Sequence, residues 1–333
     1  RSGVPGYAHC GAKFDLRRFD PAYFARLKDF CAQAAKRGIV VEVVLFCPLY
    51  RDSMWNVSPM KASNNVNRVG DIPRTECLTL RHKDLVAVQE SFVREVVAEL
   101  GHFDNVYYEI CNEPYFGGVT MAWQHRIADV IAEAEKGFSH RHLVAQNIAN
   151  KHAKVAAPHP AVSIFNFHYA VPAAVTDNFH LGRALGDDET GFRGPFDAPY
   201  LAEAWGFMMS GGAIFSNLDY SFAAGWEDGT FPYPSSQPGA GSPRLRRQLR
   251  VLKTFLESFE LVKLKPDPSV QGALALVEPG RQYAVYGRER GKAFELKVPA
   301  GRYDASWLDV ETGRVEKHEG IDHAGGAIGL RFP

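Results

Sequence analysis

The hydrophobic residues of this chain recur first at a helical and then at a strand spacing, beginning in residues 20–46. Residues 20–37 predict an amphipathic helix, with Asp20 as N-cap, Pro21 at the first helical position and Gly38 closing the last turn. The run IVVEVVLF that follows is almost continuously apolar and rich in β-branched residues. Such a run is typical of a strand that is buried on both faces of a parallel sheet.

The same alternation of helix and strand repeats along most of the chain. Six strands separated mainly by helices predict a parallel α/β sheet, and the pattern alone leaves a doubly wound sheet and a barrel both open. No GxGxxG or Walker loop follows any of the strands, which disfavours a nucleotide-binding protein. The other expected strands are 106–110, 143–148, 162–167, 184–186 and 213–218, and the other helices are 84–100, 120–136, 198–209 and 243–259.

A barrel needs about eight strands, so on that interpretation two strands are absent from the front of the sequence. The first predicted element is a helix, which fits the loss of a strand, a helix and a second strand. We therefore interpret residues 1–262 as a (β/α)8 TIM barrel that is incomplete at its N-terminus. From residue 263 onward, prolines and glycine turns separate segments that alternate apolar and polar residues. This pattern predicts a small antiparallel β-sandwich over residues 263–333.

Charge narrows the class of partner. Among 333 residues there are 38 Lys plus Arg and 38 Asp plus Glu, so the formal net charge is zero. A neutral surface offers no electrostatic footprint for nucleic acid or for an anionic membrane. No run of about 18 apolar residues predicts a membrane span. We therefore expect a neutral partner such as a carbohydrate, and the oligomeric state is left open.

The cysteines and histidines predict neither a metal nor a cofactor. None of the five cysteines forms a CxxC pair, and the twelve histidines show no HExxH spacing. An odd number of cysteines also argues against a dense disulfide framework. Cys31, Cys47 and Cys111 lie in apolar runs, where we expect buried free thiols.

Carboxylates follow two of the predicted strands. In parallel α/β folds, ligands bind at the C-terminal ends of the strands. Glu113 follows VYYEIC, and the acidic residues 187–189 follow RAL. Two carboxyl groups at one barrel mouth suit glycoside hydrolysis, because one must protonate the leaving oxygen while the other attacks or activates water.

Glu113 is the sharper of these candidates. It ends an apolar strand, Asn112 precedes it, and Pro114 stops the strand pairing so that the chain turns at the rim. On position alone, a solvated carboxylate in a loop is an equal alternative.

The second carboxylate is ambiguous because Asp187, Asp188 and Glu189 are adjacent. Strand alternation places Asp187 and Glu189 on one face and Asp188 on the other. The alternative is that this acidic run caps the next helix or binds a cation.

Further polar and aromatic residues near the strand ends are candidates for substrate contacts. Tyr115, Tyr220 and Trp226 could stack on sugar rings, and Trp226 lies in a long loop of the kind that is often functional. The alternative for that loop is a surface hinge. His168 could bond a substrate hydroxyl or orient a carboxylate, and a structural histidine is nearly as good an interpretation.

Several segments are similar to known glycosidases. VYYEICNEPYFGG resembles the acid/base strand of clan A glycoside hydrolases, in which Asn-Glu-Pro ends the fourth barrel strand, and GDDETGFRG resembles the seventh strand of family 5 and of the apiosidase-like family. Residues 13–46 and 202–222 resemble further helices and strands of these proteins, and the tail is similar to their appended β-sandwich. The resemblance implies a retaining mechanism with Glu113 as acid/base, Glu189 as nucleophile and Asn112 on the sugar 2-hydroxyl. It also suggests export to a secreted or periplasmic location.

The chain departs from the family 5 pattern in three places. No residue can be assigned the role of the arginine that the family's second strand supplies. The family's His-x-Tyr is replaced by adjacent His168 and Tyr169, so we expect only one of the two to face inward. The eighth-strand tryptophan is not evident, and Asn217, Asp219 and Tyr220 occupy its region.

The expected function is therefore a retaining glycoside hydrolase that acts on a poly- or oligosaccharide by double displacement through two glutamates. The alternative is a non-catalytic carbohydrate-binding protein on a degenerate barrel. An isomerase or aldolase barrel is disfavoured because no lysine or metal set is found at a strand end.

Overall fold

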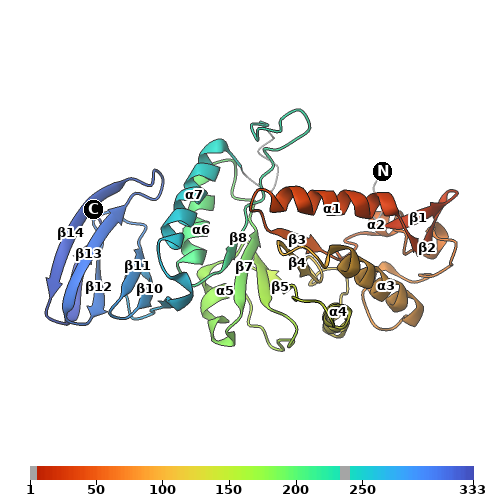
Figure 1. The fold of residues 1–333 in the computed structure, drawn as a ribbon, viewed down its shortest axis with the longest axis horizontal. Coiled ribbons are helices and arrows are strands. Elements are labelled where there is room, and N and C mark those ends of the chain that lie inside the picture. The colour runs from red at the N-terminus through yellow and green to blue at the C-terminus, as the bar shows by residue number, and fades with distance from the viewer. Residues whose placement is uncertain (1–5, 233–240) are drawn as a thin grey trace. The chain divides into compact units, whose positions relative to one another are not determined.

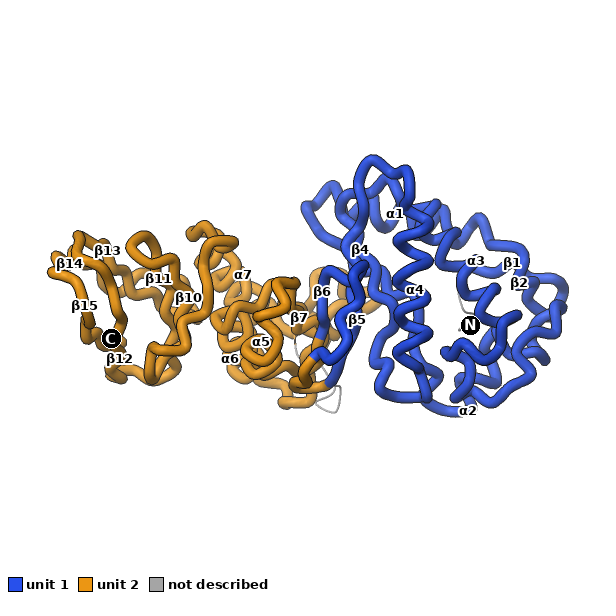
Figure 2. The backbone as a smooth tube through the Cα atoms, turned by 90° about the horizontal axis from the view of Figure 1, so that it is seen from below, with its two compact units in different colours: residues 1–149, 155–166 blue, residues 150–154, 167–333 orange. Residues whose placement is uncertain are grey.

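The computed structural model describes residues 6–232 and 241–333. The chain divides into two compact units, coloured separately in Figure 2. Unit 1 comprises Arg1–Ala149 and Val155–Asn166, and unit 2 comprises Asn150–Lys154 and Phe167–Pro333.

Six strands form one sheet in the order β3-β4-β5-β6-β7-β8 (Figure 1). The β3–β4, β4–β5 and β7–β8 pairs are parallel. An order that follows the sequence, with helices between most of the strands, is that of an incomplete (β/α) barrel, which confirms the predicted fold class. The strands are β3 (Val41–Val44), β4 (Val106–Glu109), β5 (Val144–Asn150), β6 (Ile164–His168), β7 (Ala184–Glu189) and β8 (Ile214–Phe215).

Three long helices build the core of unit 1: α1 (Pro21–Ala35), α3 (Lys83–Leu100) and α4 (Met121–Ala134). The Asp20 side chain accepts the amide of Ala22, and Thr120 accepts that of Trp123, so side-chain caps start α1 and α4. Trp123 is fully buried and donates its indole proton to Gln89 of α3. The shorter α2 spans Asp52–Trp55.

A β-hairpin precedes α1, so our expectation that a helix is the first element was wrong. β1 (Tyr7–Cys10) and β2 (Lys13–Phe19) pair antiparallel around a turn at Gly11, whose φ is +62°. The first strand is short and the second is largely polar, so the hydrophobic pattern gave little sign of them. This hairpin forms a sheet of its own and supplies no strand to the parallel sheet.

In unit 2, helices α6 (Asp197–Met208) and α7 (Pro243–Glu257) share one apolar core with strands β10 (Leu274–Glu278) and β11 (Gln282–Tyr286). Ser242 caps α7 by accepting the amide of Leu245. The α5 helix (Pro172–Thr176) is a single short turn. The core that joins these helices and strands includes Tyr200, Trp205, Leu252, Leu276 and Tyr286.

The C-terminal strands form three small antiparallel sheets, as the alternating pattern predicted. One contains β9 (Lys265–Pro266), β10 and β11, the second pairs β12 (Ala293–Val298) with β15 (Gly326–Arg331), and the third pairs β13 (Gly301–Leu308) with β14 (Val315–His323). The boundary between residues 262 and 263 stays a prediction.

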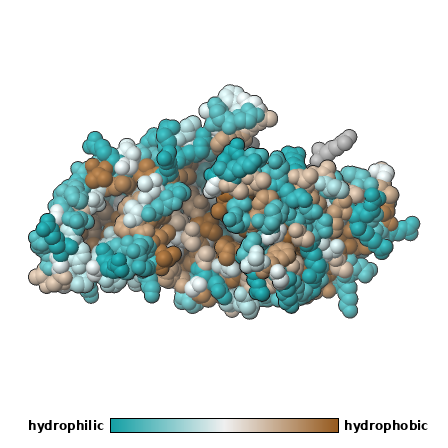
Figure 3. Space-filling model, viewed as in Figure 1, coloured by the Kyte–Doolittle hydropathy of each residue, from teal (hydrophilic) through white to brown (hydrophobic). Residues whose placement is uncertain are grey.

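The molecular surface is mostly polar on the face drawn in Figure 3, where hydrophobic side chains form small patches. Among the described residues, no helix combines the length and the apolar character that crossing a bilayer requires.

Candidate functional site

Strand β4 carries Glu113 to the end of the sheet. All four residues of β4 are buried, and so are Ile110 and Cys111 after it. The Asn112 amide still donates to Phe46 at 2.9 Å, so the pairing with the β3 segment continues to the residue before Glu113. Glu113 then adopts a φ of +41°, in the left-handed region that non-glycine residues rarely occupy. Such a strained conformation persists only where the surrounding structure holds it, and strained residues cluster at functional sites.

A hydrogen-bond network around Tyr50 fixes the Glu113 carboxylate. The Tyr50 hydroxyl donates to Glu113 Oε2 at 2.6 Å, and it accepts from Asn112 Nδ2 at 3.0 Å and from Cys47 Sγ at 3.4 Å. The phenol has a single proton, and its other two partners donate, so that proton belongs to the bond with Glu113. Burial, followed by the bonds to Cys47 and Glu113, raises the pKa of Tyr50 and keeps it protonated.

Sequence reasoning missed Tyr50 and gave Cys47 the wrong environment. Cys47 is exposed, whereas Cys31 and Cys111 are buried as predicted. The expectation failed because the apolar run ends at Phe46 and the chain leaves the sheet there. A signal was present, since both residues directly follow a predicted strand, where site residues of a barrel gather.

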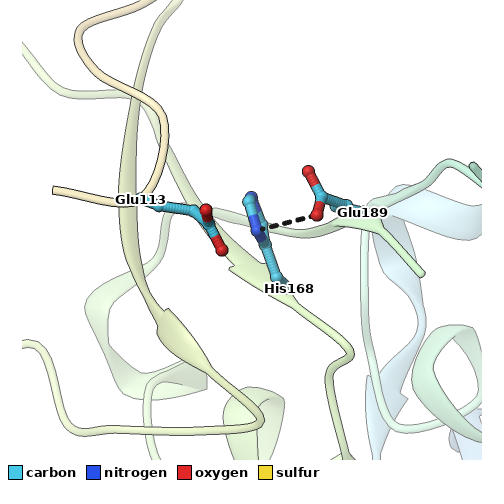
Figure 4. Close-up of side chains that lie close together, drawn as sticks. All are labelled: Glu113, His168 and Glu189. Carbon is cyan, nitrogen blue, oxygen red and sulfur yellow. Dashed lines mark ion pairs between the residues drawn. The ribbon is translucent and has the colours of Figure 1, made fainter. Parts of the chain in front are cut away.

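A second group of candidate residues lies in unit 2, around Glu189 at the end of β7. The Tyr169 hydroxyl donates to Glu189 Oε1 at 2.5 Å. His168 Nδ1 lies 3.7 Å from the same oxygen, an ion-pair distance that Figure 4 marks, and His168 Nε2 lies 3.6 Å from Asp188 Oδ1. The His168 side chain is only 1% exposed, which favours its role in orienting carboxylates.

The expectation that only one of His168 and Tyr169 could face the site was wrong. Both reach Glu189, because Tyr169 has a φ of +52° and so breaks the alternation that an extended strand imposes. The Tyr169 amide also donates to the Glu189 carbonyl at 2.7 Å, which ties the two strand ends together.

The expected grouping of Asp187 with Glu189 was also wrong. Asp187 is fully buried and its Oδ1 accepts the Ala170 amide at 3.2 Å, whereas His168 lies beside Asp188 and Glu189. Alternation does not extend to Glu189, because that residue ends the strand. Burial, followed by the charge of Glu203, raises the pKa of Asp187 well above its usual range.

The remaining candidates occupy loops after the strands. Tyr115 is 38% exposed in the loop after Glu113, and Tyr220 and Trp226 are 38% and 42% exposed in the loop after β8. Asp219 is held by Arg246 of α7 at 2.8 Å and by Ser221, so it ties this loop to the helix.

Carboxylate and imidazole groups are the ligand types that divalent metals use. Within unit 2, His168 lies beside two such groups, the carboxylates of Asp188 and Glu189. The prediction that the protein uses no metal stays a prediction.

The buried carboxyl of Glu203 on α6 predicts a stability that falls as the pH rises. Burial raises its pKa to about 7, and nearby Arg193 opposes the shift. The folded state therefore holds this proton more tightly than the unfolded state, so stability is lost as the pH climbs from about 4.5 to 7. We expect the free energy of unfolding of Glu203→Gln, relative to that of the parent, to rise by about 1–3 kcal/mol between pH 4.5 and pH 8. Urea unfolding of both proteins at the two pH values measures this difference.

The matched control is Glu295→Gln, on the exposed side of β12. It should stay within about 0.5 kcal/mol of the parent at both pH values. A Glu203→Gln difference that does not change with pH would contradict this account.

Comparisons with known proteins show a likeness in fold. No protein-family model matches the sequence, and no curated protein matches it. One solved structure of a glycoside hydrolase matches with a TM-score of 0.58 and 13% identity, over 92% of this chain and 85% of that one. A family 5 glycoside hydrolase from Bacteroides vulgatus matches with a TM-score of 0.61 and 13% identity, over 93% and 70%. The chain thus resembles these hydrolases in fold.

Proposed function

We propose that this protein is a retaining glycoside hydrolase in which Glu113 is the acid/base and Glu189 is the nucleophile. One observation carries the proposal: two glutamates follow strands β4 and β7 of a single parallel sheet, and each accepts a tyrosine hydroxyl. The C-terminal ends of parallel strands share one edge of a barrel, which is where such enzymes place their catalytic groups. The fold shared with glycoside hydrolases supports the same reaction class.

These hydrogen bonds support separate tasks for the two oxygens of each carboxylate. Tyr50 gives its proton to Oε2 of Glu113, and we assign to Oε1 the proton that Glu113 transfers to the glycosidic oxygen. Tyr169 occupies Oε1 of Glu189, so Oε2 attacks the anomeric carbon as the bond to the leaving oxygen breaks. Glu113 then takes a proton from water, the water oxygen bonds to the anomeric carbon, and Glu189 leaves. Two inversions give overall retention, which requires carboxyl groups about 5–5.5 Å apart.

The neighbouring residues suit a carbohydrate substrate. The Asn112 amide nitrogen donates to Tyr50 and to Cys47 Sγ, and we assign its carbonyl oxygen Oδ1 to accept from the sugar 2-hydroxyl. Tyr115, Tyr220 and Trp226 are exposed aromatics that can stack on sugar rings. His168 and Asp219 act through their neighbours, on Glu189 and on the loop after β8. A secreted or periplasmic location belongs to the same proposal.

The test is covalent trapping of the nucleophile. Activated 2-deoxy-2-fluoro glycosides of several sugars form a glycosyl-enzyme that hydrolyses slowly, because fluorine destabilises the oxocarbenium-like transition state. We expect intact-mass analysis to show one added sugar and peptide mapping to place it on Glu189. A label on Asp187 or Asp188 would move the nucleophile.

The second candidate function, a carbohydrate-binding protein on a degenerate barrel, predicts a different result. It requires binding of the parent sugars without any adduct and without turnover. The two tyrosine-held glutamates favour the enzyme, since a binding site has no need of two oriented carboxylates.

A further inference from the structure

A pocket of about 710 Å³ lies within unit 2, between helix α6 and the turns of the C-terminal sheets. Its volume is in the range of small-molecule sites, about 300–1,000 Å³. None of the residues assigned to the proposed catalytic site lines it.

The wall formed by α6 is made of small residues. Ala198, Ala202 and Gly206 lie four residues apart, so they share one face of the helix and leave its backbone uncovered. A Cβ placed on Gly206 would meet Pro172 Cγ only at 4.0 Å, and so the space in front of this face is open.

The opposite wall is held rigidly against α6. Tyr286 of β11 lines the pocket and stacks on Trp205 of α6, with ring centroids 5.3 Å apart and planes 24° apart. Both rings belong to the apolar core that joins α6 and α7 to the C-terminal strands. The pocket is therefore a fixed feature of this unit.

The polar groups in the pocket carry one excess positive charge. Arg193, Arg288 and Lys292 face two carboxylates, those of Glu203 and Glu289. Lys292 pairs with Glu289 at 3.2 Å, and Arg193 Nε lies 2.9 Å from Glu203 Oε2. Among the residues that the structure describes, Arg288 has no ion pair.

Glu203 is an incompletely satisfied buried carboxyl. Its side chain is 1% exposed, and within the described part of the chain neither carboxyl oxygen has a hydrogen bond of good geometry. A buried polar group without such bonds costs about 1–3 kcal/mol, and a ligand that supplies them recovers part of that cost.

We propose that this pocket is a second, non-catalytic carbohydrate site, which binds a sugar residue bearing a carboxylate. The Arg288 guanidinium receives the carboxylate, for which its planar fork is suited. Sugar hydroxyls donate to Glu203, and the carbon–hydrogen face of the ring packs on Ala202, Gly206 and Tyr286. The identification of the ligand as part of a glycan rests on the proposed function.

A phosphate ligand fits these groups less well. It would bring only acceptor oxygens toward the carboxyl of Glu203, whose oxygens have no well-oriented donor among the described residues. A ligand with one carboxylate and several hydroxyls satisfies both the unpaired Arg288 and the buried Glu203.

The test is binding of glucuronate to the full-length chain by saturation-transfer NMR and calorimetry, with glucose as the neutral match. We expect glucuronate to bind at least tenfold more tightly than glucose. Arg288→Ala should remove this preference, while Arg302→Ala, an exposed arginine on β13 away from the pocket, should preserve it. Ala202→Phe should block the pocket to both sugars. If Ala202→Phe folds poorly, Arg288→Ala still tests the proposal.

Equal binding of the two sugars, or a preference that survives in Arg288→Ala, would overturn the proposal. So would inorganic phosphate displacing glucuronate at equal concentration. Glu189→Ala should bind glucuronate as the parent does. If trapping fails but glucuronate still binds, only the catalytic assignment is refuted. If trapping succeeds but glucuronate does not bind, only the pocket proposal is refuted.

Discussion

Glu189→Ala is expected to lower kcat by at least about 10³-fold on any glycoside that the parent hydrolyses. The variant loses the oxygen that forms the covalent bond, and Tyr169 loses its acceptor. Because the lost interaction is made in the transition state, KM should change little. The measurement is steady-state hydrolysis of an aryl glycoside.

Azide provides a second measurement on the same variant. It can enter the space left by the carboxylate and attack directly, so the product should be a glycosyl azide of inverted configuration. Asp188→Asn tests the neighbouring carboxylate, and Glu295→Ala is the exposed control. Should Asp188→Asn abolish turnover while Glu189→Ala retains it, the nucleophile has been assigned to the wrong residue.

Glu113→Ala is expected to lower kcat about 10²–10⁴-fold on substrates with poor leaving groups, which is the contribution of general acid–base catalysis to the rate. On a dinitrophenyl glycoside the leaving group needs no proton, so the first step should be nearly unaffected and the glycosyl-enzyme should accumulate. Azide should then accelerate turnover and give a product of retained configuration. Rates on the two classes of substrate, with and without azide, provide the check.

Tyr50→Phe separates the chemistry of Glu113 from its positioning. It removes one hydrogen bond to a carboxylate, worth about 1.5–3 kcal/mol, so we expect the rate of hydrolysis to fall about 10- to 100-fold. The basic limb of the pH–rate profile should also move, which a purely structural residue would not cause. Unchanged rates for both Tyr50→Phe and Glu113→Ala would remove the acid/base assignment.

The buried strands could be predicted because their residues are apolar on both faces. The run at residues 39–46 was expected to be a strand, and β3 occupies Val41–Val44. The position of Glu113 could be predicted for the same reason, since a polar residue after a buried strand must lie at the end of the sheet. β8 is much shorter than expected, at Ile214–Phe215, because only these two residues pair with β7.

Contacts that depend on backbone turns could not be predicted. Tyr50 reaches Glu113 across 63 positions of sequence, and no local pattern encodes that approach. The left-handed conformation of Tyr169 is imposed by its surroundings against its own preference. The pocket on α6 was equally hidden, because alanine and glycine at helical spacing resemble an ordinary packed face.

The apolar core shared by α6, α7, β10 and β11 has a consequence for the evolution of this chain. A tail that merely adjoins a barrel can be exchanged for another by recombination, since few side chains depend on it. Here Trp205 and Leu252 of the helices pack in one cluster with Leu276 and Tyr286 of the strands, so a replacement would have to reproduce this apolar surface. We therefore expect strands β10 and β11 and helices α6 and α7 to be inherited as one piece.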